Sequence, residues 1–274
     1  MNDKTKIRLG VADYWNSVGS KSKDLNREDV WRAYLREVYR TLGTRWWEGE
    51  GIGRTLKTDL YDEAVSRHSL VSLFENQSAC MVGMDVSLET AHAAKLRLAQ
   101  TGSGWNRIAV SDARRQAFKS QVFDLILSNS TLDHFSNRAD LAASLEELYR
   151  ILKSGGVLII TLDNPCNPVV WVRNRLPYRL LKRLGIIPYY MGVTLSRAEL
   201  VRALQSIGFK ITGSTVIVHS PRVLAIWAGS ILSRTRWEGM KAGFVRLLRA
   251  IDGIERLPTK QLTGYFVAVR AVKP

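Results

Sequence analysis

Short apolar runs alternate with longer amphipathic runs from residue 55 to residue 164. The apolar runs are rich in β-branched residues and show little polar alternation, which is typical of strands covered by helices on both faces. We expect strands at 55–60, 79–87, 106–113, 122–130 and 156–164. Helical periodicity lies between them at 65–76, 89–102 and 138–156, the last with Gly155 at its C-terminal stop. This order of elements predicts a doubly wound α/β sheet.

The pattern on either side of this core predicts further elements. Residues 25–43 carry an apolar stripe at helical spacing, and Gly43 suits the end of that helix. Ser196 and Glu199 form a capping box at the start of a helix over 196–207. Two more apolar runs complete a sheet of seven strands, at 209–220 and 263–272.

Charge is distributed unevenly along the chain, whose net charge is +15. Through Asp163 there are 22 Lys and Arg against 21 Asp and Glu, whereas from Asn164 onward there are 18 against 4. Residues 164–195 are aromatic, basic and interrupted by prolines, and residues 219–262 interleave Arg and Lys with large apolar side chains. Such a concentration of positive charge in the second part of the chain favours an anionic partner. The candidates are nucleic acid, an acidic lipid headgroup and a phosphorylated substrate.

Composition narrows the class of protein. With 46% hydrophobic and 24% charged residues, the chain is expected to fold around a sizeable core. Cys80 and Cys166 lie far apart without a CxxC motif, so we expect no disulfide framework, no metal site and a reducing compartment. The first 15 residues lack a signal-peptide core, and the apolar stretch 223–233 is shorter than the ~20 residues of a spanning helix. We expect a cytoplasmic protein, with peripheral contact to the inner membrane face left open.

Acidic residues follow each of the first three strands of the expected sheet. Ligands in such sheets bind beyond the carboxyl ends of the strands. Asp85 suits a ribose, because a carboxylate accepts hydrogen bonds from both neighbouring hydroxyls. Asp112 suits the exocyclic amine of a base, and Asp59 suits an ammonium group. Together they indicate a cationic, adenosine-containing ligand without phosphates, since acids at the first turn would repel the pyrophosphate of a NAD-dependent dehydrogenase.

Four motifs extend this interpretation: "MVGMDVS" (81–87), "AVSDA" (109–113), "VFDLILSNSTLDHF" (122–135) and "EELYRILKSGGVLIITLDN" (146–164). With them, the stretch 55–163 resembles the class I S-adenosylmethionine-dependent methyltransferases. The resemblance implies S-adenosyl-L-methionine as cofactor and transfer of its sulfonium methyl group by in-line displacement. It also implies a mostly parallel, Rossmann-like sheet of seven strands in the order 3-2-1-4-5-7-6 with helical insertions.

The resemblance also implies a division of the chain and a set of site residues. The cofactor-binding core is 51–163, completed by 196–218 and 263–274; an N-terminal helical cap (1–50) and two basic, aromatic substrate-cap insertions (164–195 and 219–262) cover the cleft. By the resemblance, Asp85 accepts hydrogen bonds from the ribose hydroxyls and Asp112 from the adenine amine. Residues at the end of strand four line the methyl-transfer chamber. The expected cofactor-binding residues are Asp59, Asp62, Asp85, Val86, Asp112, Ala113, Ser128 and Asn129.

The first loop departs from the family pattern of an acid followed by three alternating glycines. In that register this chain has Lys57, Asp59, Tyr61 and Glu63, so it has no glycine where the backbone would pass the methionine part of the cofactor. We expect a reshaped but working loop, in which Asp59 or Asp62 pairs with the cofactor's ammonium group. A degenerate loop in a non-catalytic, Rossmann-like module that binds a ligand or partner is the alternative.

His134, next to Asp133, is the candidate base, because an imidazole titrates near neutral pH. The alternative is that His134 only packs below the loop while Asp133 caps the next helix. Among the tryptophans, Trp15, Trp46, Trp47 and Trp171 are candidates for a cap over the cleft, and Trp31, Trp227 and Trp237 are expected to be packing residues.

The acceptor is expected to be a small or lipid-like molecule under the basic cap, with an anionic membrane surface as a further partner. Nucleic acid is disfavoured as the acceptor, because strand four ends in "SNST" and lacks the Asn/Asp-Pro-Pro-aromatic turn that similar enzymes use on flipped bases. The sequence leaves open the oligomeric state and the atom methylated.

Overall fold

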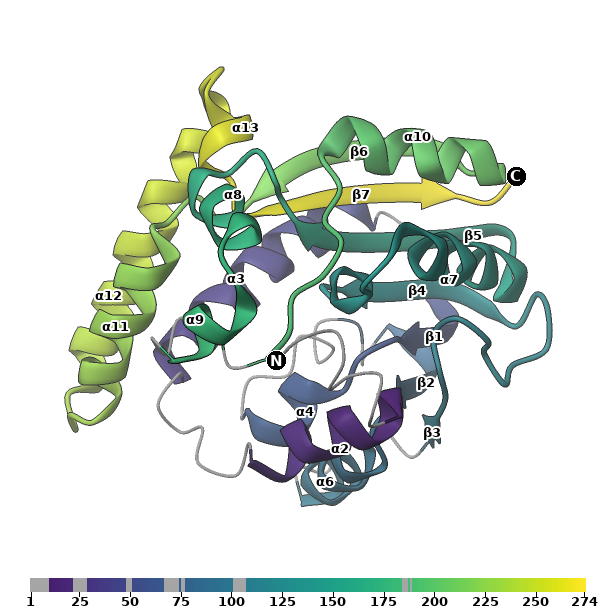
Figure 1. The fold of residues 1–274 in the computed structure, drawn as a ribbon, viewed down its shortest axis with the longest axis horizontal. Coiled ribbons are helices and arrows are strands. Elements are labelled where there is room, and N and C mark those ends of the chain that lie inside the picture. Colours follow the sequence, from purple (N-terminus) through teal and green to yellow (C-terminus); the bar gives the residue numbers. More distant parts are fainter. Residues whose placement is uncertain are drawn as a thin grey trace.

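Seven strands form one sheet in the order β3-β2-β1-β4-β5-β7-β6 in the computed structural model (Figure 1). The structure describes residues 10–21, 29–47, 51–66, 74, 77–100, 107–183, 187 and 189–274. The strands are β1 Ile52–Lys57, β2 Ser78–Asp85, β3 Arg107–Val110, β4 Phe123–Asn129, β5 Leu152–Asp163, β6 Lys210–Ile217 and β7 Phe266–Val272.

Strands β1 to β5 pair with their neighbours in parallel, and β7 lies antiparallel between β5 and β6. The doubly wound α/β class and the strand order are therefore confirmed. Because parallel strands end at the same edge, the segments that follow β1 to β4 are brought together there.

Helices cover both faces of the sheet (Figure 1). One core cluster contains buried side chains of α3, α6, α11 and α12, and the other contains those of α7 and α10. Consecutive residues of β5 alternate between the clusters: Val157 and Ile159 belong to the first, Leu158 and Ile160 to the second. The helices are α2 Val11–Lys21, α3 Asp29–Trp46, α4 Tyr61–Val65, α6 Leu88–Gln100, α7 Arg138–Ile151, α8 Pro168–Arg175, α9 Tyr178–Arg183, α10 Arg197–Ile207, α11 Arg222–Ser233, α12 Glu238–Ile251 and α13 Lys260–Thr263.

Two expected helix ends are wrong. Helix α3 continues past Gly43 to Trp46; a Cβ at Gly43 would lie 2.9 Å from the Phe74 ring, so this glycine allows close packing and does not end the helix. Helix α7 ends at Ile151 and not at Gly155. Lys273 Nζ donates to the carbonyls of Tyr149 and Leu152 at 2.7 and 2.8 Å, which satisfies the end of α7.

Strand boundaries also differ in detail from the sequence pattern. Strand β1 begins at Ile52 and ends at Lys57, three residues earlier than expected at each end, and β5 begins at Leu152. Most of the expected helix 65–76 lies outside the described residues. Within the part of the chain that the structure describes, no helix has both the length and the apolar character that crossing a bilayer requires.

The expected capping box of α10 is confirmed. The Ser196 hydroxyl accepts from Glu199 N–H, Glu199 Oε2 accepts from Ser196 N–H at 2.9 Å, and Gly208 closes the helix at φ 112°. The hydrogen bond that Glu199 accepts from Ser196 N–H is the largest cause that lowers the pKa of Glu199, to about 2.

We predict that Ser196→Ala lowers the free energy of unfolding by about 1 kcal/mol, because it removes the side-chain cap of α10. Ser206→Ala on the same helix is the control, since that hydroxyl is exposed and bonds only the Ala203 carbonyl. Urea unfolding measures both variants, and equal stability of the two would contradict the role given to the cap.

Candidate active site

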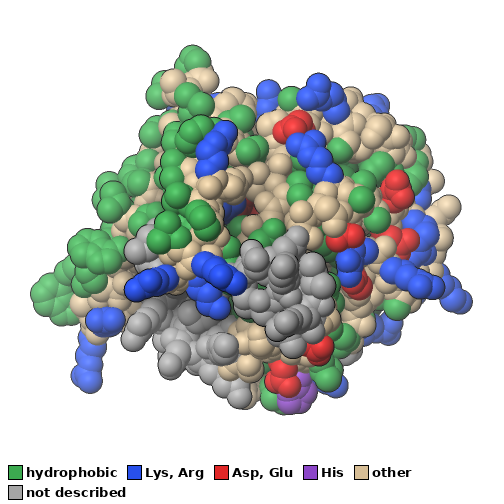
Figure 2. Space-filling view, in the orientation of Figure 1, with side chains coloured by type: hydrophobic (Ala, Val, Ile, Leu, Met, Phe, Trp, Pro, Cys, Tyr) green, Lys and Arg blue, Asp and Glu red, His purple; other side chains and the backbone are tan. Residues whose placement is uncertain are grey.

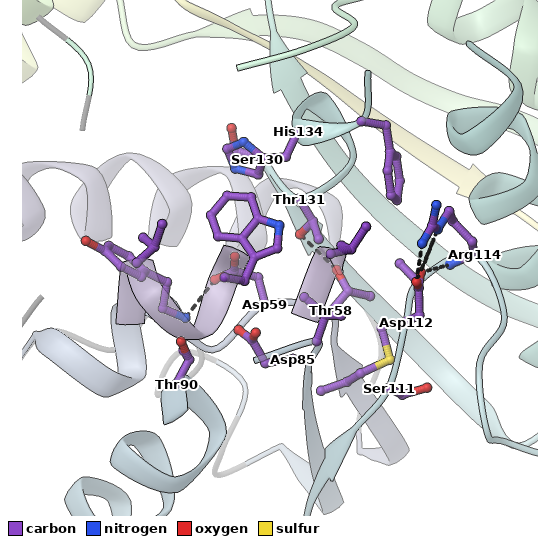
Figure 3. Close-up of a pocket in the computed structure, with 18 of the residues that line it drawn as sticks. Thr58, Asp59, Asp85, Thr90, Ser111, Asp112, Arg114, Ser130, Thr131 and His134 are labelled. Atoms are coloured by element: carbon purple, nitrogen blue, oxygen red, sulfur yellow. Dashed lines mark hydrogen bonds and ion pairs between the residues drawn. The ribbon is translucent and has the colours of Figure 1, made fainter. Parts of the chain in front are cut away.

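A cavity of about 290 Å³ lies at the carboxyl edge of β1 to β4 (Figure 3). Ser128 and Asp133 are fully buried and do not line it. Eight of the ten residues expected at the site do line it: Asp59, Asp62, Asp85, Val86, Asp112, Ala113, Asn129 and His134. The structure thus brings together acids that are distributed over more than fifty positions of the chain.

A buried ion pair spans the first loop, where the resemblance implies a glycine turn. Lys57 Nζ at the end of β1 donates to Glu63 Oε2 in α4 at 2.7 Å, and it also donates to the Asp59 carbonyl. Both side chains are inaccessible to solvent. Burial disfavours the ammonium, but the neighbouring Glu63 and Asp59 outweigh it and raise the pKa of Lys57. The pair connects the strand to α4 and so fixes the backbone between them.

A backbone N–H of this loop donates a hydrogen bond to Asp85. Leu60 N–H donates to Asp85 Oδ2 at 3.1 Å, and Ser87 N–H donates to Asp85 Oδ1 at 2.8 Å. Burial, followed by repulsion from Asp59, raises the pKa of Asp85 to about 7. Figure 3 shows Asp59 and Asp85 close together in the cavity. The Asp85 carboxylate is therefore held in place while it still faces the cavity.

Asp59 and Asp62 form the rest of the acidic side of the cavity. Asp59 Oδ1 accepts from Tyr61 N–H at 2.8 Å, which turns the chain into α4. Burial raises the pKa of Asp59, and Lys57 lowers it only in part. Asp62 lies 3.7 Å from the buried guanidinium of Arg32. These two carboxylates lie where the sequence places the ammonium group of a ligand.

Arg114 forms an ion pair with Asp112, the carboxylate that the sequence analysis assigned to the adenine amine. Its guanidinium donates to Asp112, with the shortest contact 2.6 Å at Oδ2 (Figure 3). It also reaches Asp140 at 3.2 Å. Burial acts to raise the pKa of Asp112, but the hydrogen bonds from Arg114 outweigh it and lower that pKa. Nothing in the sequence pattern indicated this pair, because an arginine two residues after an acid is common in any loop.

The segment after β4 makes a tight turn toward the cavity. Ser130 has φ 51°, in the left-handed region, and its N–H donates to the Thr161 carbonyl at 2.9 Å. Its hydroxyl donates to Asp133 Oδ2 at 2.7 Å. Ser128 lies below the turn and accepts from the Thr58 hydroxyl at 3.1 Å. The turn therefore directs Thr131 and His134 to the cavity and Asp133 into the interior.

His134 has a defined tautomer. Its Nδ1 lies 3.0 Å from the Tyr190 carbonyl oxygen, which can only accept, so Nδ1 carries the hydrogen in the neutral ring. Nε2 then bears the lone pair, 3.8 Å from Asp133 Oδ1. Burial and the nearby Asp163 raise the pKa of Asp133. Asp133 does not cap the next helix, because Asn137 accepts from Asp140 N–H at the start of α7.

Aromatic rings form one wall of the cavity. The Tyr189 ring packs edge-on or tilted against Trp15, Tyr61 and His134, with centroids 5.3–5.9 Å apart. Of the tryptophans expected in a cap, Trp15 lines the cavity, whereas Trp46 and Trp47 pack on the core and Trp171 is exposed. Tyr189 was missed, although the aromatic character of 164–195 is the signal that could have found it. An aromatic wall beside carboxylates suits a cationic ligand.

We predict that Lys57→Met lowers the free energy of unfolding by about 3–5 kcal/mol, because it leaves the Glu63 carboxylate buried without its partner. The exposed i,i+3 pair of Glu37 and Arg40 offers a matched control. Glu37→Gln is expected to change stability by less than about 1 kcal/mol. Chemical denaturation of both variants tests the difference, and a loss for Lys57→Met as small as that of the control would show that the pair does not hold the loop.

Comparison with known proteins matches part of this chain to methyltransferases. Residues 64–160 match the family model described as a methyltransferase domain. The protein ECU09_1500 of Encephalitozoon cuniculi, provisionally named a methyltransferase, is 35% identical over 81 residues, which are 30% of this chain. That match spans only 36% of the curated relative.

Solved structures share the fold at low sequence identity. The N-methyltransferase NodS from Bradyrhizobium japonicum WM9, in complex with S-adenosyl-L-homocysteine, superposes with a TM-score of 0.56 at 11% identity, over 96% of this chain and 100% of NodS. The [4+2]-cyclase SpnF gives 0.55 at 13% identity, over 87% of this chain and 80% of SpnF. A protein named only as a methyltransferase from Bacillus halodurans C-125 gives 0.54 at 15% identity, over 87% of this chain and 99% of that protein. Residues 64–160 therefore match a methyltransferase domain, and the chain as a whole has the doubly wound fold that these solved structures share.

Proposed function

We propose that this protein is a methyltransferase that binds S-adenosyl-L-methionine in the cavity at the carboxyl edge of β1 to β4. One observation carries the proposal: the described cavity lining holds five aspartates against a single arginine, in a chain of net charge +15. A concentration of carboxylates inside a basic protein favours a cationic ligand. The cofactor named by the resemblance is such a ligand, with a sulfonium, an ammonium and no phosphate.

The residues present fit that cofactor. Asp85 is held by two backbone N–H groups and can accept from a ribose diol. Asp59 lies in the loop before α4 and Asp62 in the first turn of α4, and both line the cavity and can face an ammonium group. Trp15 and Tyr189 line the cavity, where aromatic rings can contact a sulfonium. The sulfonium would supply an electrophilic methyl group when bound. The chain's task is to hold an acceptor in line with that methyl group and to exclude water.

His134 is the proposed base. The hydrogen bond from Nδ1 to the Tyr190 carbonyl leaves Nε2 unprotonated in the neutral ring, so Nε2 can take a proton from a hydroxyl, thiol or amine. Asp133 lies 3.8 Å from Nε2 and stabilises the imidazolium once it forms. Both residues come from the turn that Ser130 makes after β4.

The proposed acceptor is lipid-like and anionic. Helices α8 and α9 present Arg175, Arg179, Lys182 and Arg183 to solvent, and residues 164–198 contain no acid. A second cavity lies beneath these helices, with Leu176, Leu181 and Met191 in its lining, and it shares Ser136 with the first. An apolar chain with a negatively charged group fits such surroundings, and an acceptor of this kind implies peripheral contact with a membrane.

A non-catalytic binding module is the second candidate, and the Arg114–Asp112 ion pair is the observation that favours it. An adenine amine must displace that guanidinium to reach Asp112. The fold alone does not decide between the two, because one fold carries many functions.

S-adenosyl-L-homocysteine binding separates the candidates. We expect calorimetry to show binding by the wild type and loss of binding in Asp85→Ala, because the ribose hydroxyls lose their acceptor. Asp124→Ala is the control, since Asp124 pairs with Lys153 at the opposite end of the sheet. No binding by folded wild-type protein would refute the proposed function.

The affinity is predicted to depend on pH. Only ionised Asp85 accepts from both hydroxyls, and its pKa of about 7 means that binding strengthens about tenfold from pH 6 to pH 8. In the ligand-free protein, the raised pKa means that the folded state binds the Asp85 proton more tightly than the unfolded state does. Proton binding therefore stabilises the folded protein at low pH, and this stabilisation is lost as pH rises through about 7. Titrations at both pH values should show a flat profile in Asp85→Asn, and a persistent slope would assign the titration to another group.

His134→Gln is expected to lower kcat by about 10²–10⁴-fold and to leave S-adenosyl-L-homocysteine affinity unchanged, because a base acts only in the chemical step. The measurement is transfer of a tritiated methyl group to a total lipid extract. His92→Gln, an exposed histidine on α6, is the control. Undiminished transfer by His134→Gln would remove the residue from the mechanism.

A further inference from the structure

Helices α11 and α12 form a pair at one side of the molecule (Figure 1). Both pack on α3 through their inner faces: Ala225 and Gly229 of α11 are buried, and a Cβ at Gly229 would lie 3.6 Å from Val30. Leu248 of α12 is buried, and Arg249 donates to the Thr41 hydroxyl at 2.9 Å. The pair is therefore fixed to the core and presents its outer surface to solvent.

The outer surface of this pair is apolar. Leu224 is 64% exposed, Trp227 65% and Trp237 66%, so the expectation that these two tryptophans are packing residues is wrong. Val223, Trp227 and Ile231 recur at a spacing of four along α11, which places them on one side of the helix. We call this surface the α11–α12 apolar face; its members are Val223, Leu224, Trp227, Ile231, Trp237, Met240 and Leu247.

A surface helix ordinarily turns its polar side to water. Helix α11 has no charged residue between Val223 and Ser233, so it is apolar toward α3 and toward solvent alike. A large exposed apolar surface on a folded protein marks an interaction site. Figure 2 shows hydrophobic side chains gathered along this side of the molecule. The α11–α12 apolar face thus needs an occupant.

Charge identifies the occupant. The turn between the two helices carries Arg234 and Arg236, both exposed, and α12 adds Arg246. Glu238 is the one acid in residues 221–251, and it pairs with Lys241 at 2.8 Å. Cations around apolar side chains match the anionic headgroups and the hydrocarbon of a lipid leaflet. A second copy of this chain would instead bring like charges together.

We propose that the α11–α12 apolar face docks in the plane of an anionic lipid bilayer. At 12 residues, α11 is about 18 Å long, shorter than the ~30 Å hydrocarbon core, and its inner side is occupied by α3. Trp227 and Trp237 sit at the headgroup level, where tryptophan is enriched. This inference stands on exposure and charge and is independent of the proposed methyl transfer.

Vesicle flotation tests the inference with the full chain. The probes are vesicles of pure phosphatidylcholine and vesicles with 30% phosphatidylglycerol, at low and high salt. We expect at least about tenfold more binding to the anionic vesicles, reduced by salt, because each cation near the surface contributes about 1 kcal/mol. Equal recovery with both vesicles, or none with either, would overturn the proposal.

Matched variants locate the contact. The double variant Leu224→Glu/Trp227→Ser should lose vesicle binding about tenfold or more, whereas Leu96→Glu, at a site 53% exposed on α6, should keep it. Arg234→Glu/Arg236→Glu should lose binding, and Lys95→Glu/Lys119→Glu should keep it. Thermal unfolding confirms that each variant is folded.

Other occupants give a different result. If sedimentation shows a dimer of the wild type that Leu224→Glu dissociates, while vesicle binding is unchanged by that substitution, the occupant is a second copy and the proposal is wrong. Loss of vesicle binding in all four variants alike would also overturn it, because the contact would then be general charge attraction.

Discussion

The buried ion pair between Lys57 and Glu63 is the constraint on which the candidate site depends. In the family that the sequence resembles, a glycine-rich turn lets the backbone pass close to the ligand. Here the charge of Lys57 at the end of β1 is met by Glu63 in α4, and the segment between them is fixed by that bond. In this loop the Leu60 N–H donates to Asp85, and the Asp59 side chain lines the cavity. A sequence that lacks the turn glycines thus retains a loop of defined shape.

The position of this loop explains why acids can gather in a strongly basic protein. Parallel strands end at one edge, so Asp59, Asp85 and Asp112 meet there although they are far apart in the chain. Burial, followed by repulsion from Asp59, raises the pKa of Asp85 to about 7, and a cationic ligand offsets the repulsion. Exposed cations lie elsewhere, among them Arg175 and Arg179 on α8 and α9 and Arg234 and Arg236 between α11 and α12. The acidic cavity and these exposed cations are therefore separated in space.

The sequence predicted the class of fold and eight of the residues that line the cavity, because strand periodicity and the residues after each strand are local features. The capping box of α10 was predicted for the same reason. Long-range packing decided the rest. Gly43 faces Phe74 and does not end α3. Lys273 bonds the carbonyls at the end of α7, and Tyr189 reaches the cavity from the segment between β5 and α10. Trp227 was misplaced because composition cannot tell which side of an apolar helix the core covers.

The central claim is that the row of carboxylates binds a positively charged nucleoside without phosphates. A crystal structure of the protein with S-adenosyl-L-homocysteine tests it most directly. The account predicts ribose hydroxyls within hydrogen-bond distance of Asp85, the ligand's ammonium group beside Asp59 or Asp62, and Arg114 moved away from Asp112. A nucleoside bound outside this cavity, or one that leaves Asp85 without a contact, would contradict it.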